Sequence, residues 1–408
     1  MSGKLLPAAA AAVMLLCAPV TASAAVPLIS GNYAYSNSET CQAPSPAGGG
    51  AIRSAWEVAD FDHATGKVQF TGDGISGALV VPSGPGGLTE SHLSGPVSYS
   101  NTATTITVGA QTFNVVYGPV ANGVVQSFVY GGIVGTCALS VTMIRQPTTP
   151  HQAPLISGNY AVTVRAICQA SSPAGGGDIV ALSLVGHFAS GTVKLNGAIM
   201  GGQLVVPAGD LGGIGLELAA YSGSYSNTAA KITWQVSELG SAVTTDIVYG
   251  AVTNGIAEAF VFEYVQQSCA YSWMAIREPA AVQTAPLISG KYAFTLNIIC
   301  QAPAGGGGTI AYEWGTADFH HAKGEMTFSG VGIDGDLIVT SGPGGLTEGN
   351  GTQTSSYSNT KTTFTLTDLA TFNVAYGPII NGIAQSFLYG GVFVVEPTCL
   401  ITGIAIRQ

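Results

Sequence analysis

The sequence predicts an all-β protein of three tandem repeats, each an antiparallel meander barrel of about eight strands closed by one disulfide. Three observations support this prediction. The segment Pro-Leu-Ile-Ser-Gly-x-Tyr occurs three times, beginning at Pro27, Pro154 and Pro286, a spacing of 127 and then 132 residues. Short runs rich in Val, Ile, Thr, Tyr and Phe alternate with Gly and Pro, and two cysteines recur at matching places in every copy.

The repeats and their joints follow from these markers. Residues 1–24 fit a signal peptide, because Lys4 precedes an apolar run and Ala22-Ser23-Ala24 fits a cleavage site. We therefore expect a secreted or periplasmic/cell-surface protein. Each repeat is long enough to bury its own core, so we expect separate barrels, like beads on a string. The expected boundaries are 25–146, 153–278 and 285–408 for the repeats, with Pro-containing linkers at 147–152 and 279–284.

Six cysteines remain after the signal segment, two in each repeat. An even number in an exported chain indicates disulfides. Each repeat is self-contained only if its own pair closes. The expected pairs are Cys41 with Cys137, Cys168 with Cys269, and Cys300 with Cys399.

The strands of the first repeat can be placed from its apolar runs and turn residues. Asn122-Gly123 fits a hairpin turn, because both residue types tolerate positive φ. No segment after the signal has a convincing amphipathic helical pattern. The expected strands lie near 28–36, 51–60, 67–71, 77–82, 96–100, 104–108, 112–117, 124–130 and 137–145.

The spacing of residues in the first and last strands of each repeat predicts how these two strands pair. Tyr33 precedes Cys41 by eight residues, and Arg145 follows Cys137 by eight, with the same spacing in both other copies. Eight is even, so both members of each pair lie on one face of a strand. If the two strands are antiparallel neighbours with the cysteines opposed, Tyr lies opposite Arg. Such a ladder closes the sheet into a barrel; a β-sandwich is the alternative.

A Gly-x-aromatic on the first strand with an Arg on the last resembles the calycin pattern of lipocalin-like and avidin-like barrels. The resemblance implies a closed barrel that can hold a ligand, although this chain has Tyr where those families usually have Trp. It gives Tyr and Arg a structural role at one end of each barrel. The residues that carry it are Gly31, Tyr33 and Arg145; Gly158, Tyr160 and Arg277; and Gly290, Tyr292 and Arg407.

Composition excludes several classes of partner. Only 8% of residues are charged and the formal net charge is −10, which disfavours nucleic acid and anionic membranes. No stretch after the signal is long and apolar enough for a transmembrane helix. The partner is therefore unknown, with a small molecule or an extracellular surface as the candidates.

The first and third repeats share polar residues that the second lacks, and these form the candidate ligand-binding set. An Asp-x-x-His segment can orient an imidazole or bind a metal, but two ligands are too few to predict a metal. Counting back from Gly72, Gly197 and Gly330 puts Ala181, Val185 and Phe188 at the matching positions of the second repeat. The set is Trp56, Asp60, His63 and Glu90 in the first repeat, and Trp314, Asp318, His321 and Glu348 in the third.

No catalytic or cofactor-binding motif is present: there is no Gly-x-Ser-x-Gly, no His-Glu-x-x-His and no phosphate-binding loop. We therefore expect no cofactor and favour an exported, non-catalytic binding or surface-associated protein. A carrier of small apolar ligands with one cavity per barrel is one alternative. A secreted hydrolase that uses the Asp and His loops of the first and third repeats is the other.

Overall fold

The structure is a computed structural model of the chain. The signal segment lies outside the described residues, and so do most of the two expected linkers. The described residues are 26–44, 48–81, 87–146, 153–172, 174–207, 213–236, 241–278, 284–339, 345–367, 369–393 and 398–408.

Each repeat forms a closed, eight-stranded antiparallel barrel, as the sequence predicts. In the first two barrels, strands that neighbour each other in the barrel also follow each other in the chain, apart from the closing pair. Barrel 1 contains β1 (Gly31–Cys41), β3 (Ala51–Asp62), β4 (Lys67–Gly77), β5 (Thr89–Asn101), β6 (Thr105–Val108), β7 (Gln111–Tyr117), β10 (Ser127–Val134) and β11 (Cys137–Arg145). Barrel 2 contains β12 (Gly158–Cys168), β13 (Gly176–Ala189), β14 (Thr192–Val206), β15 (Gly215–Asn227), β16 (Lys231–Val236), β17 (Val243–Tyr249), β20 (Ala259–Gln266) and β21 (Cys269–Arg277).

Barrel 3 repeats this order, with a short 3-10 turn at His321–Lys323 between its second and third strands. No helix among the described residues is long and apolar enough to cross a membrane. The strands are β22 (Gly290–Cys300), β24 (Thr309–His320), β25 (Glu325–Gly335), β27 (Thr347–Asn359), β28 (Thr363–Leu366), β29 (Ala370–Tyr376), β32 (Ser386–Phe393) and β33 (Cys399–Arg407).

The register of the closing strands confirms the inference from the two eight-residue offsets. Tyr33 lies opposite Arg145 and Cys41 opposite Cys137, and both other barrels have the same pairing. All three predicted disulfides are present. The Tyr33 hydroxyl donates to the carbonyl of Val125 at 2.7 Å, and its counterparts make the same bond, so each Tyr anchors one end of its barrel.

The repeated Tyr-Ser-Asn-Thr segment ties the start of each repeat to its barrel. In barrel 1 the Tyr99 hydroxyl donates to the carbonyl of Ile29 at 2.8 Å, and Asn101 Nδ2 donates to the carbonyl of Pro27 at 3.0 Å. The other two repeats have equivalent bonds. Ile29 itself is fully buried under this end of the barrel. The two repeated motifs are therefore the two halves of one structural contact.

Local turn chemistry also matches the prediction. Asn122 and Gly123 both have positive φ, 51° and 78°, in the hairpin between β8 (Val120–Ala121) and β9 (Val124–Val125). Equivalent Asn-Gly turns join β18 (Val252–Thr253) to β19 (Ile256–Ala257) and β30 (Ile379–Ile380) to β31 (Ile383–Ala384).

The expected strand at 77–82 is wrong: it is not a barrel strand. β4 runs on to Gly77, and the chain then leaves the barrel. Val80 bridges Gly49 of its own repeat and Ala170 of the second repeat. The segment is apolar because it packs between barrels, and a sequence pattern does not reveal which partner an apolar segment will meet.

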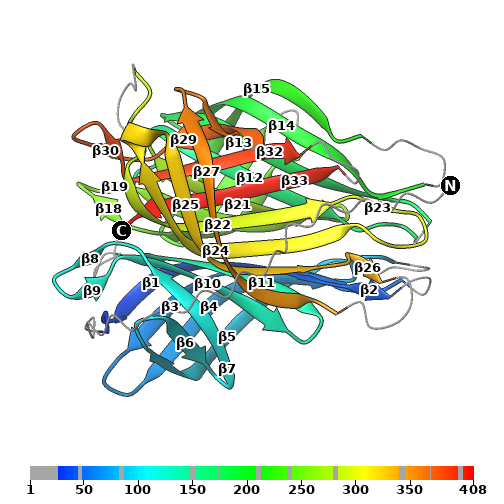
Figure 1. The fold of residues 1–408 in the computed structure, drawn as a ribbon, viewed down its shortest axis with the longest axis horizontal. Helices are drawn as coiled ribbons and strands as arrows, with labels where there is room; N and C mark the ends of the chain where they lie inside the picture. The colour runs from blue at the N-terminus through cyan, green and yellow to red at the C-terminus, as the bar shows by residue number, and fades with distance from the viewer. Residues whose placement is uncertain are drawn as a thin grey trace.

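The three barrels pack into a closed ring, so the expectation of separate beads is wrong. Figure 1 shows the blue-to-cyan first barrel lying against the other two. The segment after the first cysteine of each repeat pairs in parallel with a segment of the preceding repeat, and the first repeat pairs with the third. The pairs are β2 (Ala43–Pro44) with β26 (Ile338–Val339), Ala170 with Val80, and β23 (Ala302–Pro303) with β14 at Val205–Val206.

Side chains repeat the same cyclic pattern. The glutamine after each first cysteine donates to a backbone carbonyl of the preceding repeat. The bonds are Gln42 to Asp336 at 2.7 Å, Gln169 to Ala78 at 2.6 Å, and Gln301 to Gln203 at 2.8 Å. Because the same contact recurs between every successive pair and closes on itself, the chain has the pseudo-threefold geometry of a cyclic trimer.

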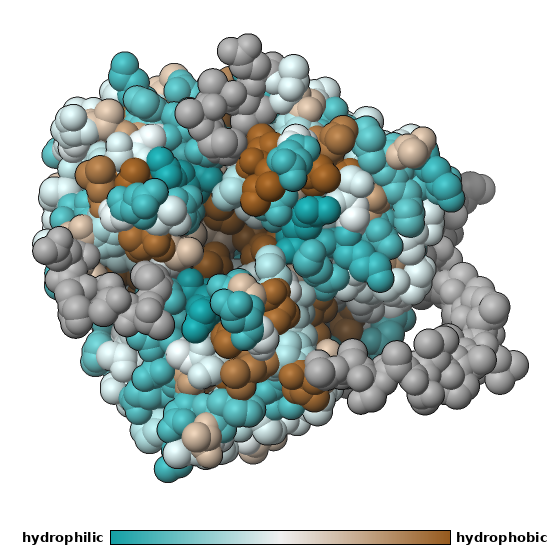
Figure 2. Space-filling view, turned by 90° about the vertical axis from the view of Figure 1, so that its left-hand side faces the viewer, coloured by the Kyte–Doolittle hydropathy of each residue, from teal (hydrophilic) through white to brown (hydrophobic). Residues whose placement is uncertain are grey.

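The cores reflect this arrangement. Each barrel interior has its own apolar cluster, and the largest cluster lies between the barrels with members from all three repeats. Strands such as β10 are buried on both faces, which explains their continuous apolar runs. Figure 2 shows the end of the ring where the C-terminus lies, with apolar side chains gathered around a hollow near the middle of that face.

Candidate functional site

The two tryptophans of the predicted site lie at the joints between barrels. Trp56 and Trp314 point out of their own barrels and are 0% and 1% exposed. Trp56 Nε1 donates to the carbonyl of Asp246 in the second repeat, and Trp314 Nε1 donates to the carbonyl of Asn114 in the first, both at 3.0 Å. Each indole therefore holds its barrel against the next one in the ring.

The expected counterparts in the second repeat are wrong by two residues. Trp56 pairs with Ser36 across β3 and β1, and the matching residue Thr163 pairs with Ser183, not with Ala181. The β13–β14 turn has two residues, whereas the β3–β4 turn has four. Counting back from Gly72 and from Gly197 crosses these turns, so the difference in their lengths shifts the alignment by two residues. By the same register, His187 and not Val185 matches Asp60 and Asp318.

Asp60 and His63 lie away from Trp56. Asp60 is exposed, four residues further along β3, which is roughly 13 Å on an extended strand. His63 is in the exposed turn after β3, with Nδ1 3.4 Å from the Tyr99 hydroxyl, whose proton goes to Ile29. In the third repeat, Asp318 lies on β24, and His321 contacts Tyr357 in the same way. No nucleophile lies beside these histidines among the described contacts, so the hydrolase alternative gains no support.

The two glutamates of the predicted set belong with the tryptophans at the joints. Glu90 Oε1 accepts the backbone N–H of Val265 in the second repeat at 2.8 Å. Glu348 Oε1 accepts from Asn114 Nδ2 in the first repeat at 3.3 Å. The structure thus divides the predicted set: Trp and Glu join barrels, whereas Asp and His lie at the exposed end of the strand.

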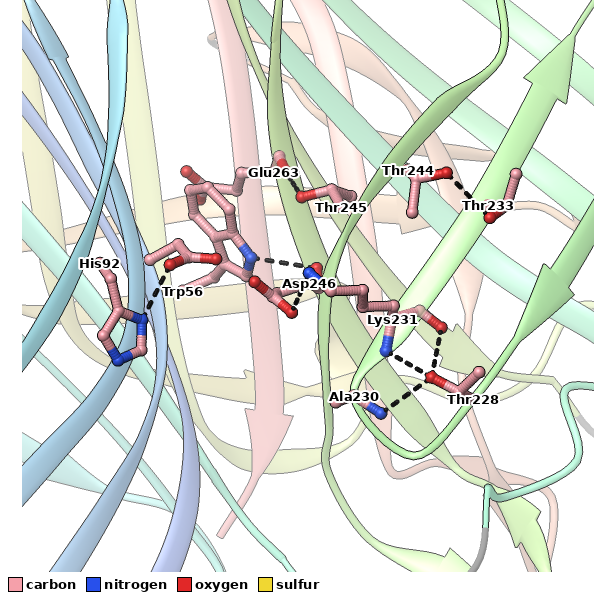
Figure 3. A network of polar contacts seen from close by, with 11 residues as sticks. Trp56, His92, Thr228, Ala230, Lys231, Thr233, Thr244, Thr245, Asp246 and Glu263 are labelled. Atoms are coloured by element: carbon pink, nitrogen blue, oxygen red, sulfur yellow. Dashed lines mark hydrogen bonds and ion pairs between the residues drawn. The ribbon is translucent and has the colours of Figure 1, made fainter.

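The joint between barrels 1 and 2 carries a cluster of charges, shown in Figure 3. His92 Nδ1 lies 3.0 Å from an oxygen of Asp73, and Lys231 Nζ lies 2.9 Å from an oxygen of Asp246. Burial and the neighbouring Asp246 raise the pKa of Asp73. Burial acts in the same direction on Asp246, but hydrogen bonds from Asp73 and Lys231 outweigh it and lower the pKa of that carboxyl.

A cavity of about 430 Å³ lies in barrel 1 and is open to solvent, and Leu93 in its wall is 40% exposed. Its wall is mostly apolar and aromatic, and Glu57 is the only charged group among the described residues that line it. This volume falls within the range of about 300–1,000 Å³ that small-molecule sites have. The lining residues are Tyr35, Glu57, Phe70, Leu93, Ser94, Gly95, Val97, Val108, Gln111, Phe113, Tyr130 and Leu139.

Barrel 2 is filled at the corresponding positions. Trp234 pairs with Tyr225 where Val108 pairs with Tyr99 in barrel 1, and Trp273 pairs with Val164 where Val141 pairs with Asn37. The two indoles pack with ring centroids 4.7 Å apart in the middle of barrel 2. Of the two valines that stand in place of these tryptophans in barrel 1, Val108 lines the cavity.

Barrel 3 is filled in another way. The ring of Tyr389 lies directly over Gly403, where an added Cβ would clash with it. The Tyr389 hydroxyl donates to the carbonyl of Thr295 at 2.6 Å. In barrel 1 the residue at the Gly403 position is Val141, so Tyr130 cannot lie across the barrel in the same way.

Glu57 is buried on the inner face of β3 and is 4% exposed. No hydrogen bond or ion pair joins its carboxyl to another described residue. Burial raises its pKa to about 7; His92 on the outer face opposes this shift and Asp73 adds to it. Nearby, Asn37 Nδ2 donates to the Tyr35 hydroxyl at 2.6 Å, and Asn37 Oδ1 is buried with no partner. Glu57 is therefore a polar group in the wall of the cavity that the described side chains leave unpaired.

A second, smaller cavity of about 100 Å³ lies on the pseudo-threefold axis between the first and last strands of all three repeats. Hydroxyl side chains and two cations, Arg53 and Arg165, are among the residues that line it. The Arg165 guanidinium donates to the Tyr312 hydroxyl and to Thr40 Oγ1, both at 3.3 Å. A space of this size suits water molecules that satisfy the polar wall.

One group of three metal-type ligands occurs among the described residues: Glu39, Cys41 and Cys137 lie within 4.8 Å of one another. The two sulfurs are bonded to each other in the disulfide, so they offer no thiolate to a metal.

Sequence reasoning missed Glu57, although a signal was available. Glu57 directly follows Trp56 on a strand whose neighbours Ala55 and Ala59 point into the barrel. An acidic residue on the inner face of a barrel strand is a buried charge, which marks a candidate site. The register needed to see this depends on pairing Glu57 with Tyr35, which the structure supplies.

Comparisons with known proteins give no family for this chain. No family model matches it, and no curated protein matches it. Among solved structures, the chain has a faint similarity to the β domain of the Bordetella autotransporter BrkA, at 11% identity over 93% of this chain and 99% of that one. The TM-score is 0.12, so this similarity carries no argument about fold or function.

Proposed function

We propose that this chain is an exported, non-catalytic binding protein, and that its site is the cavity of barrel 1, which holds a small, largely apolar molecule. The cavity is the observation that carries the proposal: it has a suitable volume and a wall of aromatic and aliphatic side chains. Three disulfides support export to an oxidising compartment.

The proposal assigns different roles to the three repeats. Barrel 2 has Trp234 and Trp273 packed inside it, and in barrel 3 the Tyr389 ring lies over Gly403, so among the described residues the ligand-carrier hypothesis is argued for barrel 1. The ring contacts make the other barrels a rigid support for the hollow one. Such support offsets the loss of packing inside barrel 1, because the outer faces of its strands are buried against their neighbours.

A fluorescence titration tests the proposal. The probe is N-phenyl-1-naphthylamine, an uncharged apolar fluorophore, added to the purified full chain. Gly95 lines the cavity, and an added Cβ there meets nothing within 4 Å. The variant Gly95→Phe therefore places a ring in the cavity. The control is Gly351→Phe on β27 of barrel 3, also an open position.

We expect saturable binding by the wild-type protein, at least tenfold weaker binding by Gly95→Phe, and unchanged binding by Gly351→Phe. Absence of saturable binding by the wild-type protein, or equal loss in both variants, would contradict the proposal.

A further inference from the structure

We propose that the cavity of barrel 1 selects a small apolar amine, whose ammonium group pairs with the Glu57 carboxylate. This inference rests on the proposed function and names the chemical class of its ligand. It begins from Glu57, which is 4% exposed, faces the cavity, and has no hydrogen-bond or ion-pair partner among the described residues. A buried carboxylate without a partner is costly, so a bound cation would relieve a penalty that the free protein carries.

The other repeats show that the barrel does not need this carboxyl. Leu184 occupies the position in barrel 2, since it pairs with Val162 as Glu57 pairs with Tyr35. Gly315 occupies it in barrel 3. At this register position the acidic side chain occurs only in barrel 1, so closing a barrel does not require it there. Barrel 3 has an inner carboxyl at a different position, Glu313, which pairs with Leu296.

The surroundings of Glu57 also suit a cation. Two aromatic pairs lie around the cavity, Tyr35 with Phe70 and Phe113 with Tyr130, each with ring centroids 5.3 Å apart. Aromatic faces attract ammonium groups through the negative face of the ring. No Lys or Arg is among the described lining residues, so none of these side chains competes with a ligand for the carboxylate.

The rest of the cavity wall determines the polarity of the ligand beyond its amine. Leu93, Val97, Val108 and Leu139 offer no hydrogen bond, so the part of the ligand beyond the amine is apolar. One aromatic ring with a short alkylamine chain fits within about 430 Å³. Burial raises the pKa of Glu57 to about 7, and the positive charge of a bound amine would return the carboxyl to its ionised form.

Isothermal titration calorimetry of the full chain tests the inference with three ligands of similar size. These are 2-phenylethylamine, its neutral analogue 2-phenylethanol, and the anion 3-phenylpropanoate. The wild-type protein should bind the amine at least tenfold more tightly than the alcohol, as expected for a hydrogen bond to a buried charge. It should bind the anion most weakly.

Two variants test whether the preference for the amine over the alcohol depends on Glu57. Glu57→Gln should bind amine and alcohol equally, whereas Glu313→Gln, which removes a carboxyl from inside barrel 3, should keep the wild-type preference. Equal binding of amine and alcohol by the wild-type protein would overturn the inference, even if Glu57→Gln fails to fold. So would a preference that survives in a folded Glu57→Gln variant.

These outcomes are separable from failure of the proposed function. If 2-phenylethanol binds and competes with N-phenyl-1-naphthylamine but the amine has no advantage, only the amine inference fails. If neither the three ligands nor the fluorophore bind, the proposed function fails as well.

Discussion

The substitution Glu57→Gln should make the free energy of unfolding depend less steeply on pH. The size of this effect can be worked out from the structure. The pKa of Glu57 rises from 4.5 to about 7 on folding, because the carboxyl is buried. Below pH 4.5 the carboxyl is protonated in both states, so it costs nothing on folding. Between pH 4.5 and 7 the unfolded chain loses the proton first, so stability falls as pH rises. Above pH 7 the loss is complete.

A shift of this size corresponds to about 3 kcal/mol, since one pKa unit is about 1.4 kcal/mol. This is an upper limit, because water in the open cavity solvates part of the carboxylate. Glu57→Gln should therefore gain up to about 3 kcal/mol over the wild-type protein between pH 4 and pH 8. Burial also raises the pKa values of Glu263 and Glu278 to about 7, but both residues are present in both proteins and cancel in the difference.

Guanidinium unfolding followed by tryptophan fluorescence, with disulfides intact, measures the difference at each pH. Glu217→Gln, at an exposed position on β15, controls for removal of one negative charge. The reasoning is refuted if the difference between Glu57→Gln and wild type stays flat from pH 4 to pH 8. A difference that shrinks as pH rises would refute it too.

Two predictions concern the joints and the packing of glycines. Trp314→Ala removes a buried indole and its bond to the first repeat, so it should lower the free energy of unfolding by about 3–5 kcal/mol. Ser183→Ala, at the matching position of the second repeat, should cost less than about 1 kcal/mol in the same denaturation assay. Gly131→Ala should destabilise by about 1–3 kcal/mol, because an added Cβ would lie 2.6 Å from a backbone oxygen and 2.9 Å from Trp314. Gly95→Ala, which meets no atom, should leave the melting temperature within about one degree; a larger loss at Gly95 than at Gly131 would contradict the packing argument.

The closure of each barrel could be predicted from the sequence alone. Side chains alternate on a strand with a period of two, so equal even offsets from Tyr33 to Cys41 and from Cys137 to Arg145 leave one register for an antiparallel pair. The Asn-Gly hairpins could be predicted for a similar reason, since their positive φ is a property of the residues themselves. The hairpin turn is determined by two adjacent residues, and the closing register is supported by the same spacing in three repeats.

The ring and the cavity were decided only by the tertiary structure. An outward-facing apolar residue such as Trp56 can be predicted to be buried. The sequence does not predict that its indole N–H will donate to the carbonyl of Asp246 in another repeat. The cavity in barrel 1 depends on a missing volume: Val108 lines it at the position where barrel 2 has Trp234. A sequence shows each of these residues, but the space left between them exists only once the eight strands of barrel 1 have closed around it.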